Sequence, residues 1–108
     1  MHILVVDDDP LMIDRVVLLL GPRGWDVHGL SSGRQALAYV EQHAVDAVLL
    51  DVHMGRMNGY EVCAALRSLP NAQHIPILII TADDNDEAIE RAFDAGATDY
   101  IRKPFRQT

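Results

Sequence analysis

The sequence has little of several features that define common classes of protein. It contains one cysteine, Cys63, so no disulfide can form within the chain, and a reducing compartment fits this composition. No apolar run approaches the roughly 18 residues that a transmembrane helix needs. The apolar residues 3–6 are followed directly by acids, unlike the hydrophobic part of a signal peptide. We therefore expect a cytoplasmic protein that does not enter a membrane.

The chain also lacks the charge and the motifs of proteins that bind nucleic acids or nucleotides. Its formal net charge is −7, whereas DNA binding requires basic patches that neutralise phosphates, so we expect no direct contact of this domain with nucleic acid. No glycine-rich phosphate loop follows the first apolar run, which argues against a nucleotide-binding module. Scattered histidines without the spacing of metal ligands argue against a zinc site: they are His2, His28, His43 and His74.

Short apolar runs alternate along the chain with amphipathic stretches. The chain has 108 residues, of which 49% are hydrophobic, enough for the core of one domain covering residues 1–108. Strands are expected at residues 3–6, 25–30, 47–50, 77–80 and 99–102. Helices are expected at residues 10–20, from about 33 onward, at 59–69, and between the acids at 83–86 and Gly96. The alternation predicts a single α/β domain with a parallel sheet.

Apolar side chains at helical spacing mark the faces expected to point into the core. In the first helix these are Ile13, Val16, Val17 and Leu20, and in the fourth they are Ile89, Ala92 and Phe93. Cys63 lies in the third helical pattern without an activating base nearby, so we expect it to serve packing.

The final helix of a doubly wound sheet is expected to be missing or truncated, because only three residues follow Phe105. Apolar sheet surface would then be open to water. At about 25 cal/mol per Å², roughly a few hundred Å² of such surface would cost several kcal/mol. We expect the natural protein to be longer, with self-association through the open face as the alternative.

The carboxyl ends of the expected strands carry the candidate chemistry, since ligands of open parallel sheets bind there. The polar residues at those ends are Asp7, Asp8, Asp51, Thr81 and Lys103. Carboxylates at close range repel one another unless a cation joins them, and Mg²⁺ prefers oxygen ligands. A carboxylate beside such an ion can attack a phosphoryl group, whose oxygens the lysine and the hydroxyl would neutralise and bind. Asp9 is expected to cap the first helix rather than to bind metal.

Four segments resemble the receiver domain of response regulators in two-component signalling. They are residues 3–9, residues 46–59, residues 79–82 and the stretch from Gly96 through Lys103 to Phe105, which together span nearly the whole chain in the family's order. The resemblance implies a flavodoxin-like five-stranded sheet in the order 2-1-3-4-5. It also implies a Mg²⁺-dependent switch, with Mn²⁺ as an alternative ion, that is phosphorylated on Asp51.

The resemblance assigns roles to individual residues. The metal ligands that it implies are Asp8, Asp51, the backbone carbonyl of His53 and, through water, Asp7. The groups that it implies around the phosphoryl are Lys103, Thr81 and the backbone amide of Ala82. Tyr100 would be the aromatic switch that turns inward when Thr81 moves, and His53 and Asp83 would tune the lifetime of the phosphate.

The resemblance also implies partners. A sensor histidine kinase or a phosphotransfer protein would donate the phosphoryl group from a phosphohistidine. The receiver would catalyse its own phosphorylation and dephosphorylation without being an enzyme that turns over a substrate. An effector domain or a second copy in a homodimer would receive the signal, and partners commonly bind the outer side of the fourth helix together with the fifth strand.

His53 and Gly55 in the loop after Asp51 are expected to influence how this loop behaves. Gly55 stands where the family usually has proline, so this loop should be more mobile. The side chain of His53 either affects dephosphorylation, by orienting water or donating a hydrogen bond, or is an exposed loop histidine of which only the carbonyl is used.

Two alternative functions are an aspartate-nucleophile phosphatase and a degenerate receiver. An aspartate-nucleophile phosphatase on a related fold usually has a second acid two residues after its nucleophile, whereas Val52 and His53 follow Asp51 here, and no cap domain is present. A degenerate receiver that serves only protein contacts would not need the acids, the hydroxyl and the lysine that this chain retains.

Overall fold

The computed structural model of this chain describes residues 1–82 and 85–102. Its strands are β1 (His2–Val6), β2 (Asp26–Leu30), β3 (Ala47–Asp51), β4 (Ile77–Thr81) and β5 (Asp99–Arg102). Its helices are α1 (Pro10–Leu20), α2 (Gly33–Gln42), α3 (Gly59–Arg67) and α4 (Asp86–Asp94), with the short 3₁₀ helices η1 (Gly21–Arg23) and η2 (Pro70–Ala72). The strands form one parallel sheet in the order β2-β1-β3-β4-β5, which confirms the predicted fold class.

The burial of the strands follows their place in the sheet. Residues 3–6 of β1 and most of β3 and β4 are buried, as parallel strands covered on both faces should be. The edge strands β2 and β5 contain no buried residue. The second strand, expected at residues 25–30, begins at Asp26 rather than at Trp25, and its more polar sequence fits its place at an edge.

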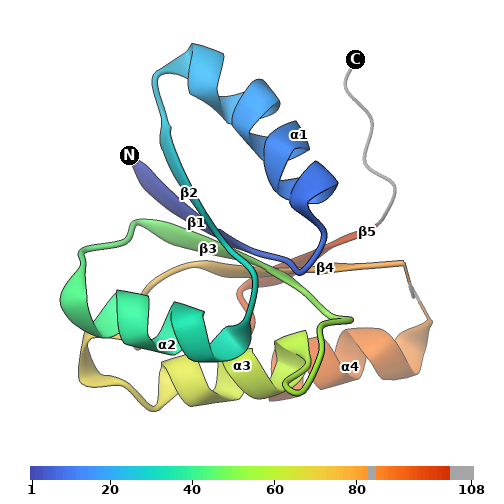
Figure 1. The fold of residues 1–108 in the computed structure, drawn as a ribbon. Helices are drawn as coiled ribbons and strands as arrows, with labels where there is room; N and C mark the ends of the chain where they lie inside the picture. The colour runs from blue at the N-terminus through green and yellow to red at the C-terminus, as the bar shows by residue number, and fades with distance from the viewer. Residues whose placement is uncertain (83–84, 103–108) are drawn as a thin grey trace.

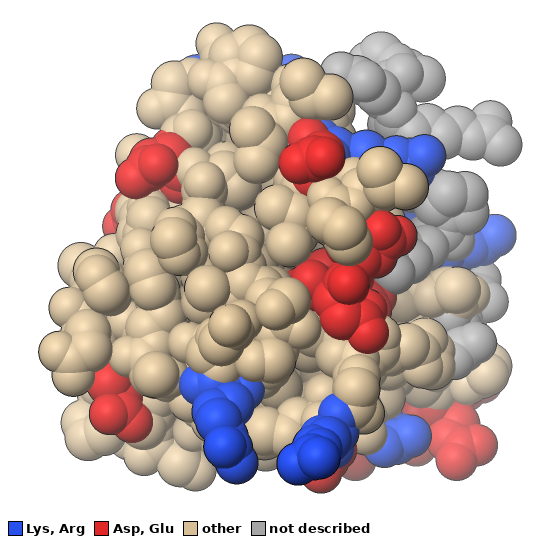
Figure 2. Space-filling view, viewed as in Figure 1, with Lys and Arg blue, Asp and Glu red and all other residues tan. Residues whose placement is uncertain are grey.

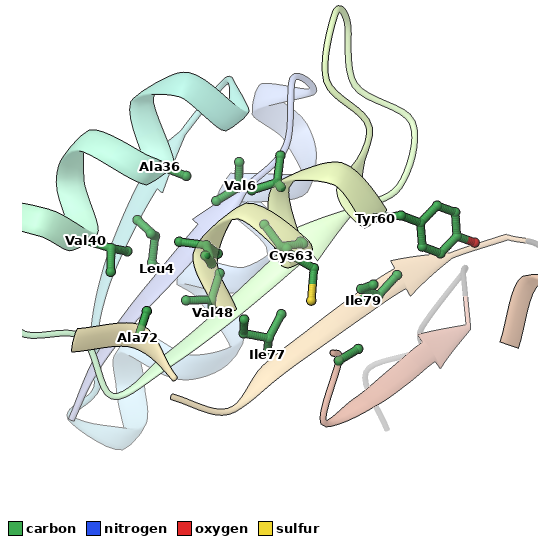
Figure 3. Packing of buried hydrophobic residues seen from close by; sticks show 14 of the residues in the cluster. Leu4, Val6, Ala36, Val40, Val48, Tyr60, Cys63, Ala72, Ile77 and Ile79 are labelled. Carbon is green, nitrogen blue, oxygen red and sulfur yellow. The ribbon is translucent and has the colours of Figure 1, made fainter. Parts of the chain in front are cut away.

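The helices lie in two layers around the sheet (Figure 1). Helices α2, α3 and α4 lie on one face, where the larger core cluster joins the sheet to α2 and α3. Figure 3 shows Leu4, Val48 and Ile77 of the central strands gathered near Cys63 of α3. These four side chains are almost completely buried. Cys63 is thus part of the core, as expected.

The opposite face carries a smaller apolar cluster. Ile3, Val5 and Val16 form its buried centre, with half-buried side chains of α1 and the sheet around them. Among the described residues α1 is the only helix on this face, and Leu49, Leu78 and Ile101 are half-buried there. Residues 103–108, on which the expectation of a truncated final helix rests, lie outside the described residues.

The prediction that Phe93 and Val17 lie in the core was wrong. Phe93 is 47% exposed and Val17 is 41% exposed, whereas their neighbours Ala92 and Val16 are buried. Each wrong residue directly follows a buried one, so it lies about 100° further around its helix. Phe93 instead makes an edge-to-face contact with Tyr100, with ring centroids 6.3 Å apart.

The ends of the helices reflect local backbone chemistry. Asp9 is the N-cap of α1, and its carboxylate accepts from the backbone N–H of Leu11 at 3.0 Å, which confirms the expected cap. Helix α3 ends at Arg67 rather than at Leu69 because a residue before proline avoids the helical region, and Leu69 is extended before Pro70. No helix in the described part of the chain is long and apolar enough to cross a membrane.

Candidate functional site

The register of the sheet brings the polar strand ends to one edge. Val6 pairs with Leu50, so Asp7 and Asp51 directly follow a matched pair of residues on neighbouring strands. Asp51 pairs with Ile80, which places Thr81 one residue beyond it on β4. Thr81 in turn pairs with Arg102 at the end of β5. The carboxyl ends of β1, β3, β4 and β5 are therefore adjacent.

Three carboxylates meet at this edge. Oxygen atoms of Asp7, Asp8 and Asp51 all lie within 4.8 Å of one another. Asp7 and Asp51 are 1% and 3% exposed, whereas Asp8 is exposed to solvent. Figure 2 shows a compact group of acidic side chains on the surface here. Carboxylates held this close, one of them open to water, could together hold a hard cation.

Backbone hydrogen bonds hold the first acid of this group in place. The Asp7 N–H donates to the carbonyl of Leu30 at 3.0 Å, which extends the pairing of β1 with β2 by one residue. The Asp9 N–H donates to the Asp7 carboxylate at 2.9 Å. The turn into α1 thus fixes the Asp7 carboxylate and leaves Asp8, between them, directed to the solvent side of the group.

The segment after Asp51 is tied to both the sheet and α3. The Val52 N–H donates to Ile80 at 3.1 Å, and the Gly59 N–H donates back to the Val52 carbonyl at 2.9 Å. Asn58 begins α3 with a capping box, in which its side chain and that of Glu61 each accept from the other's backbone N–H. The loop is therefore anchored at both ends, and His53 and Gly55 are exposed between them.

Glycine is required where this loop closes onto β3. A Cβ added to Gly59 would lie 2.4 Å from the carbonyl oxygen of Asp51 and 3.0 Å from the Cα of Val52, both of them backbone atoms. The absence of a side chain at the first residue of α3 therefore lets that helix approach the strand that carries Asp51. Sequence reasoning placed Gly59 at the start of a helix but did not identify this contact.

The remaining predicted site residues that the structure describes lie on or directly after β4 and on β5. Thr81 is 3% exposed at the end of β4, and Ala82, directly after it, is exposed. Tyr100 is half-buried on β5 and contacts Phe93 of α4. Lys103 and Asp83 lie outside the described residues.

One further cavity lies beside His53. It is lined by His53 and Tyr60 on one side and by Asn85, Ala88 and Arg91 of the α4 region on the other. The Arg91 guanidinium lies 4.3 Å from the centre of the Tyr60 ring, a cation–π contact. This contact joins α3 to α4, the element expected to bind partners, beside the loop that carries His53.

Three histidines that are far apart in the sequence, His2, His28 and His43, gather around Tyr39 in the fold. The Tyr39 ring is sandwiched between those of His28 and His43, with centroids 4.4 and 4.0 Å away. His2 Nε2 lies 2.6 Å from the Tyr39 hydroxyl, and its Nδ1 lies 3.0 Å from a carboxylate oxygen of Asp26. Burial, and secondarily the charge of Asp26, raise the pKa of the Tyr39 hydroxyl.

This histidine cluster does not form a metal site. In the described ranges, Asp7, Asp8 and Asp51 are the one group of three or more acidic, histidine or cysteine side chains close enough to hold an ion. Cys63 is equally unsuited to chemistry, because burial raises the pKa of its thiol, only partly opposed by Arg67.

A doubly wound parallel sheet with acids buried at the ends of two adjacent central strands defines a class of α/β domain that binds its ligand at the switch in winding direction. Comparison with known proteins gives the family. The model of the response regulator receiver domain matches residues 3–108. The chain belongs to this family.

Individual relatives agree with the family model. The response regulator MprA of Mycolicibacterium vanbaalenii is 42% identical over 104 residues, which are 96% of this chain and 44% of that protein. The chain thus spans less than half the length of the curated relatives that it matches. The chemotaxis protein CheY4 of Vibrio cholerae superposes with a TM-score of 0.93 at 31% identity, covering 97% of this chain and 88% of that one.

A third similar protein was solved with a metal ion bound. The receiver domain of the sensor histidine kinase PA1611 from Pseudomonas aeruginosa was solved with a magnesium ion coordinated in its active-site cleft. It superposes with a TM-score of 0.89 at 30% identity, covering 97% of this chain and 86% of that one. The curated relatives MprA and MtrA are both named as response regulators.

Proposed function

We propose that this receiver accepts a phosphoryl group from a phosphohistidine onto Asp51, in a reaction that depends on Mg²⁺. The observation that carries the proposal is the buried Asp51 carboxylate, whose oxygen lies within 4.8 Å of those of Asp7 and Asp8. Three oxygen donors at this spacing suit a hard divalent ion, and Mn²⁺ would serve in its place. A bound ion supplies charge neutralisation between the acids and the incoming phosphoryl oxygens.

The chain's own groups would perform the transfer. An oxygen of Asp51 attacks phosphorus, the bond from phosphorus to the histidine nitrogen of the donor breaks, and the nitrogen keeps the bonding electrons. Asp8 and the His53 carbonyl, with Asp7 acting through water, hold the ion. Lys103, the Thr81 hydroxyl and the Ala82 amide bind the phosphoryl oxygens. The support for these roles is the adjacency of the strand ends on which the described residues among them lie.

Phosphorylation would change the outer surface of α4. The phosphoryl group carries about 1.5 to 2 negative charges, which draws the Thr81 hydroxyl toward Asp51. Thr81 pairs with Arg102 on β5, and Tyr100 lies two residues before Arg102 on the same strand. Tyr100 would therefore turn inward when Thr81 moves. Because its ring contacts Phe93, that motion would reach the exposed face of α4. The signal would thus appear on the surface formed by α4 and β5.

The proposal includes the partners of the domain. A sensor histidine kinase or a phosphotransfer protein supplies the phosphoryl group in a cytoplasmic, reducing compartment, where Cys63 stays a free thiol. Because the curated relatives are more than twice as long as the matched region, an effector domain following this receiver is the leading output. A homodimer formed through the half-covered sheet face is the alternative.

The test is phosphorylation by acetyl phosphate with and without Mg²⁺, followed by intact mass. We expect one base-labile phosphoryl group in the wild type and none in Asp51→Asn. Asp14→Asn, which alters an exposed acid of α1, is the matched control and should behave as the wild type. Equal labelling of Asp51→Asn would refute the assignment, and repeated hydrolysis of phosphate esters would establish the phosphatase instead.

The lifetime of the phosphate tests the exposed loop. We propose that the side chains of His53 and Asp83 set the dephosphorylation rate, His53 by orienting water or donating a hydrogen bond. His53→Ala should change the decay rate of the phosphorylated protein while leaving its Mg²⁺ affinity intact, because only the backbone carbonyl serves the ion. An unchanged decay rate would mean that the histidine side chain is only part of the exposed surface.

A further inference from the structure

A second cavity adjoins the acidic group, and the proposed function does not use it. Its volume is about 330 Å³, within the range of small-molecule sites. It is lined by Asp8, by residues 31–34 at the start of α2, and by residues 54–57 of the loop that follows Asp51. The cavity therefore lies between the first turn of a helix and the loop that carries part of the metal site.

Two of the side chains that line this cavity are basic. Arg34 and Arg56 both line it and both are exposed. Within the described residues neither forms an ion pair or a side-chain hydrogen bond, unlike Arg67, whose guanidinium donates four. Two guanidinium groups on one cavity, with no acid neutralising either, bind carboxylates or phosphates well. On this face Figure 2 shows basic side chains standing apart from the acidic group.

The floor of the cavity is apolar. Met54 is 5% exposed and Met57 is half-buried, and both line the cavity. Gly33 allows α2 to pack against Val62 and Met57, since an added Cβ would collide with Cγ2 of Val62 and lie 3.3 Å from the Cβ of Met57. Methionine side chains adapt to the shape of an apolar ligand. The cavity thus combines a cationic wall with a soft apolar floor.

Asp8 determines which way a ligand would lie. Its carboxylate stands at the end of the cavity that adjoins the metal site, where it repels an anion. The two arginines offer the favourable end. We propose that this cavity binds a small organic anion, with its carboxylate or phosphate held by Arg34 and Arg56 and its short apolar body against Met54 and Met57.

Such a ligand would be coupled to the metal site, an inference that rests on the proposed function. The anion would join the start of α2 to residues 54–57, because both segments line the cavity. Fixing this loop also fixes the His53 carbonyl, and bound Mg²⁺ would weaken the repulsion by Asp8. Anion and Mg²⁺ should therefore raise each other's affinity by the same factor.

The experiment is titration of the intact chain with phenylphosphonate, which cannot transfer its phosphoryl group, at saturating Mg²⁺. We expect Arg34→Ala and Arg56→Ala each to weaken binding ~10-fold, as the loss of one charge-assisted contact. Arg15→Ala, which removes an exposed arginine of α1, should change nothing. Binding to the double variant Arg34→Ala/Arg56→Ala that equals the wild type would overturn the proposal.

Two further arms make the outcome unambiguous. Inorganic phosphate should bind at least ~10-fold more weakly than phenylphosphonate if the methionine floor contributes, and equal affinities would overturn the assignment of an apolar body. Asp51 should still be phosphorylated by acetyl phosphate in the double variant. If only the anion site is wrong, the protein will not bind phenylphosphonate but Asp51 will still be phosphorylated. If the proposed function is wrong, Asp51 will not be phosphorylated even in the wild type.

Discussion

Gly59→Ala would test whether the packing of α3 against β3 sets the geometry of the phosphorylation site. The new Cβ would lie 2.4 Å from the carbonyl oxygen of Asp51, whereas carbon and carbonyl oxygen ordinarily approach to about 3.3 Å. The backbone must therefore move by roughly 0.9 Å, because neither atom belongs to a side chain that can rotate away. Functional groups need to be held within roughly 0.5 Å of their working geometry, so the shift reaches the chemistry.

Two measurable losses follow from that displacement. Overpacking costs about 1–3 kcal/mol, offset in part by the roughly 0.5–1 kcal/mol that alanine gains over glycine in a helix, so the free energy of unfolding should fall by about 1–2 kcal/mol. A misplacement near 1 Å can cost up to about 100-fold in rate. We expect phosphorylation of Gly59→Ala by acetyl phosphate to slow by ~10-fold or more, with weaker Mg²⁺ binding in calorimetry.

Two other glycines provide matched controls. Gly55→Ala lies in the same loop, where an added Cβ meets nothing within 4 Å, and should neither destabilise the fold nor slow phosphorylation. Gly33→Ala would collide with the side chain of Val62, which can shift, so it should cost stability without slowing phosphorylation to the same degree. If Gly59→Ala matched Gly55→Ala in urea unfolding and in rate, the close approach of α3 would not position Asp51.

Three further predictions concern stability and metal. Arg67→Ala should lower the free energy of unfolding by about 2–3 kcal/mol, because the carbonyls of Ala72, Ile75 and Gly96 lose a charged donor. Urea unfolding measures this loss, and a loss smaller than that of the exposed Arg15→Ala would contradict the prediction. Mg²⁺ at about 100 times its Kd should stabilise the wild type by ~2.7 kcal/mol, as read from thermal unfolding, and equal stabilisation of Asp8→Asn would exclude Asp8 as a ligand. Burial raises the pKa of the Cys63 thiol, so its contribution to stability is complete below the unfolded thiol's pKa of about 8.5 and is lost as pH rises through the folded value. Cys63→Ala should therefore lose less stability between neutral pH and about pH 10, and identical pH profiles would show that the thiol does not contribute.

The sheet could be predicted from the sequence because its signals are local. Continuous apolar runs identify strands buried on both faces, and the polar residues that follow them identify the edge where ligands bind. Asp9 before Pro10 and Asn58 before Gly59 are helix caps that need only their immediate neighbours. The order of the strands came from the family resemblance, since alternation alone leaves the order open.

Side-chain surroundings could not be predicted in the same way. Phe93 fits an apolar helical pattern, yet Ala88 and Ala92 take the buried face of α4. His2, His28 and His43 are far apart in sequence and gather around Tyr39 only because β1 pairs with β2 and α2 packs beside them. Gly59 gave no sign that its missing side chain accommodates the carbonyl of Asp51.

The sequence by itself determined that the strands are followed by acids and a hydroxyl, and therefore which chemistry the domain can carry. These features can be read from the sequence because hydrophobic periodicity and helix capping act over a few neighbouring residues. Only the tertiary structure decided that Asp7, Asp8 and Asp51 stand within 4.8 Å of one another and that Arg34 and Arg56 share a cavity. Those distances depend on strand register and on helix packing, which are set by contacts between segments far apart in the chain.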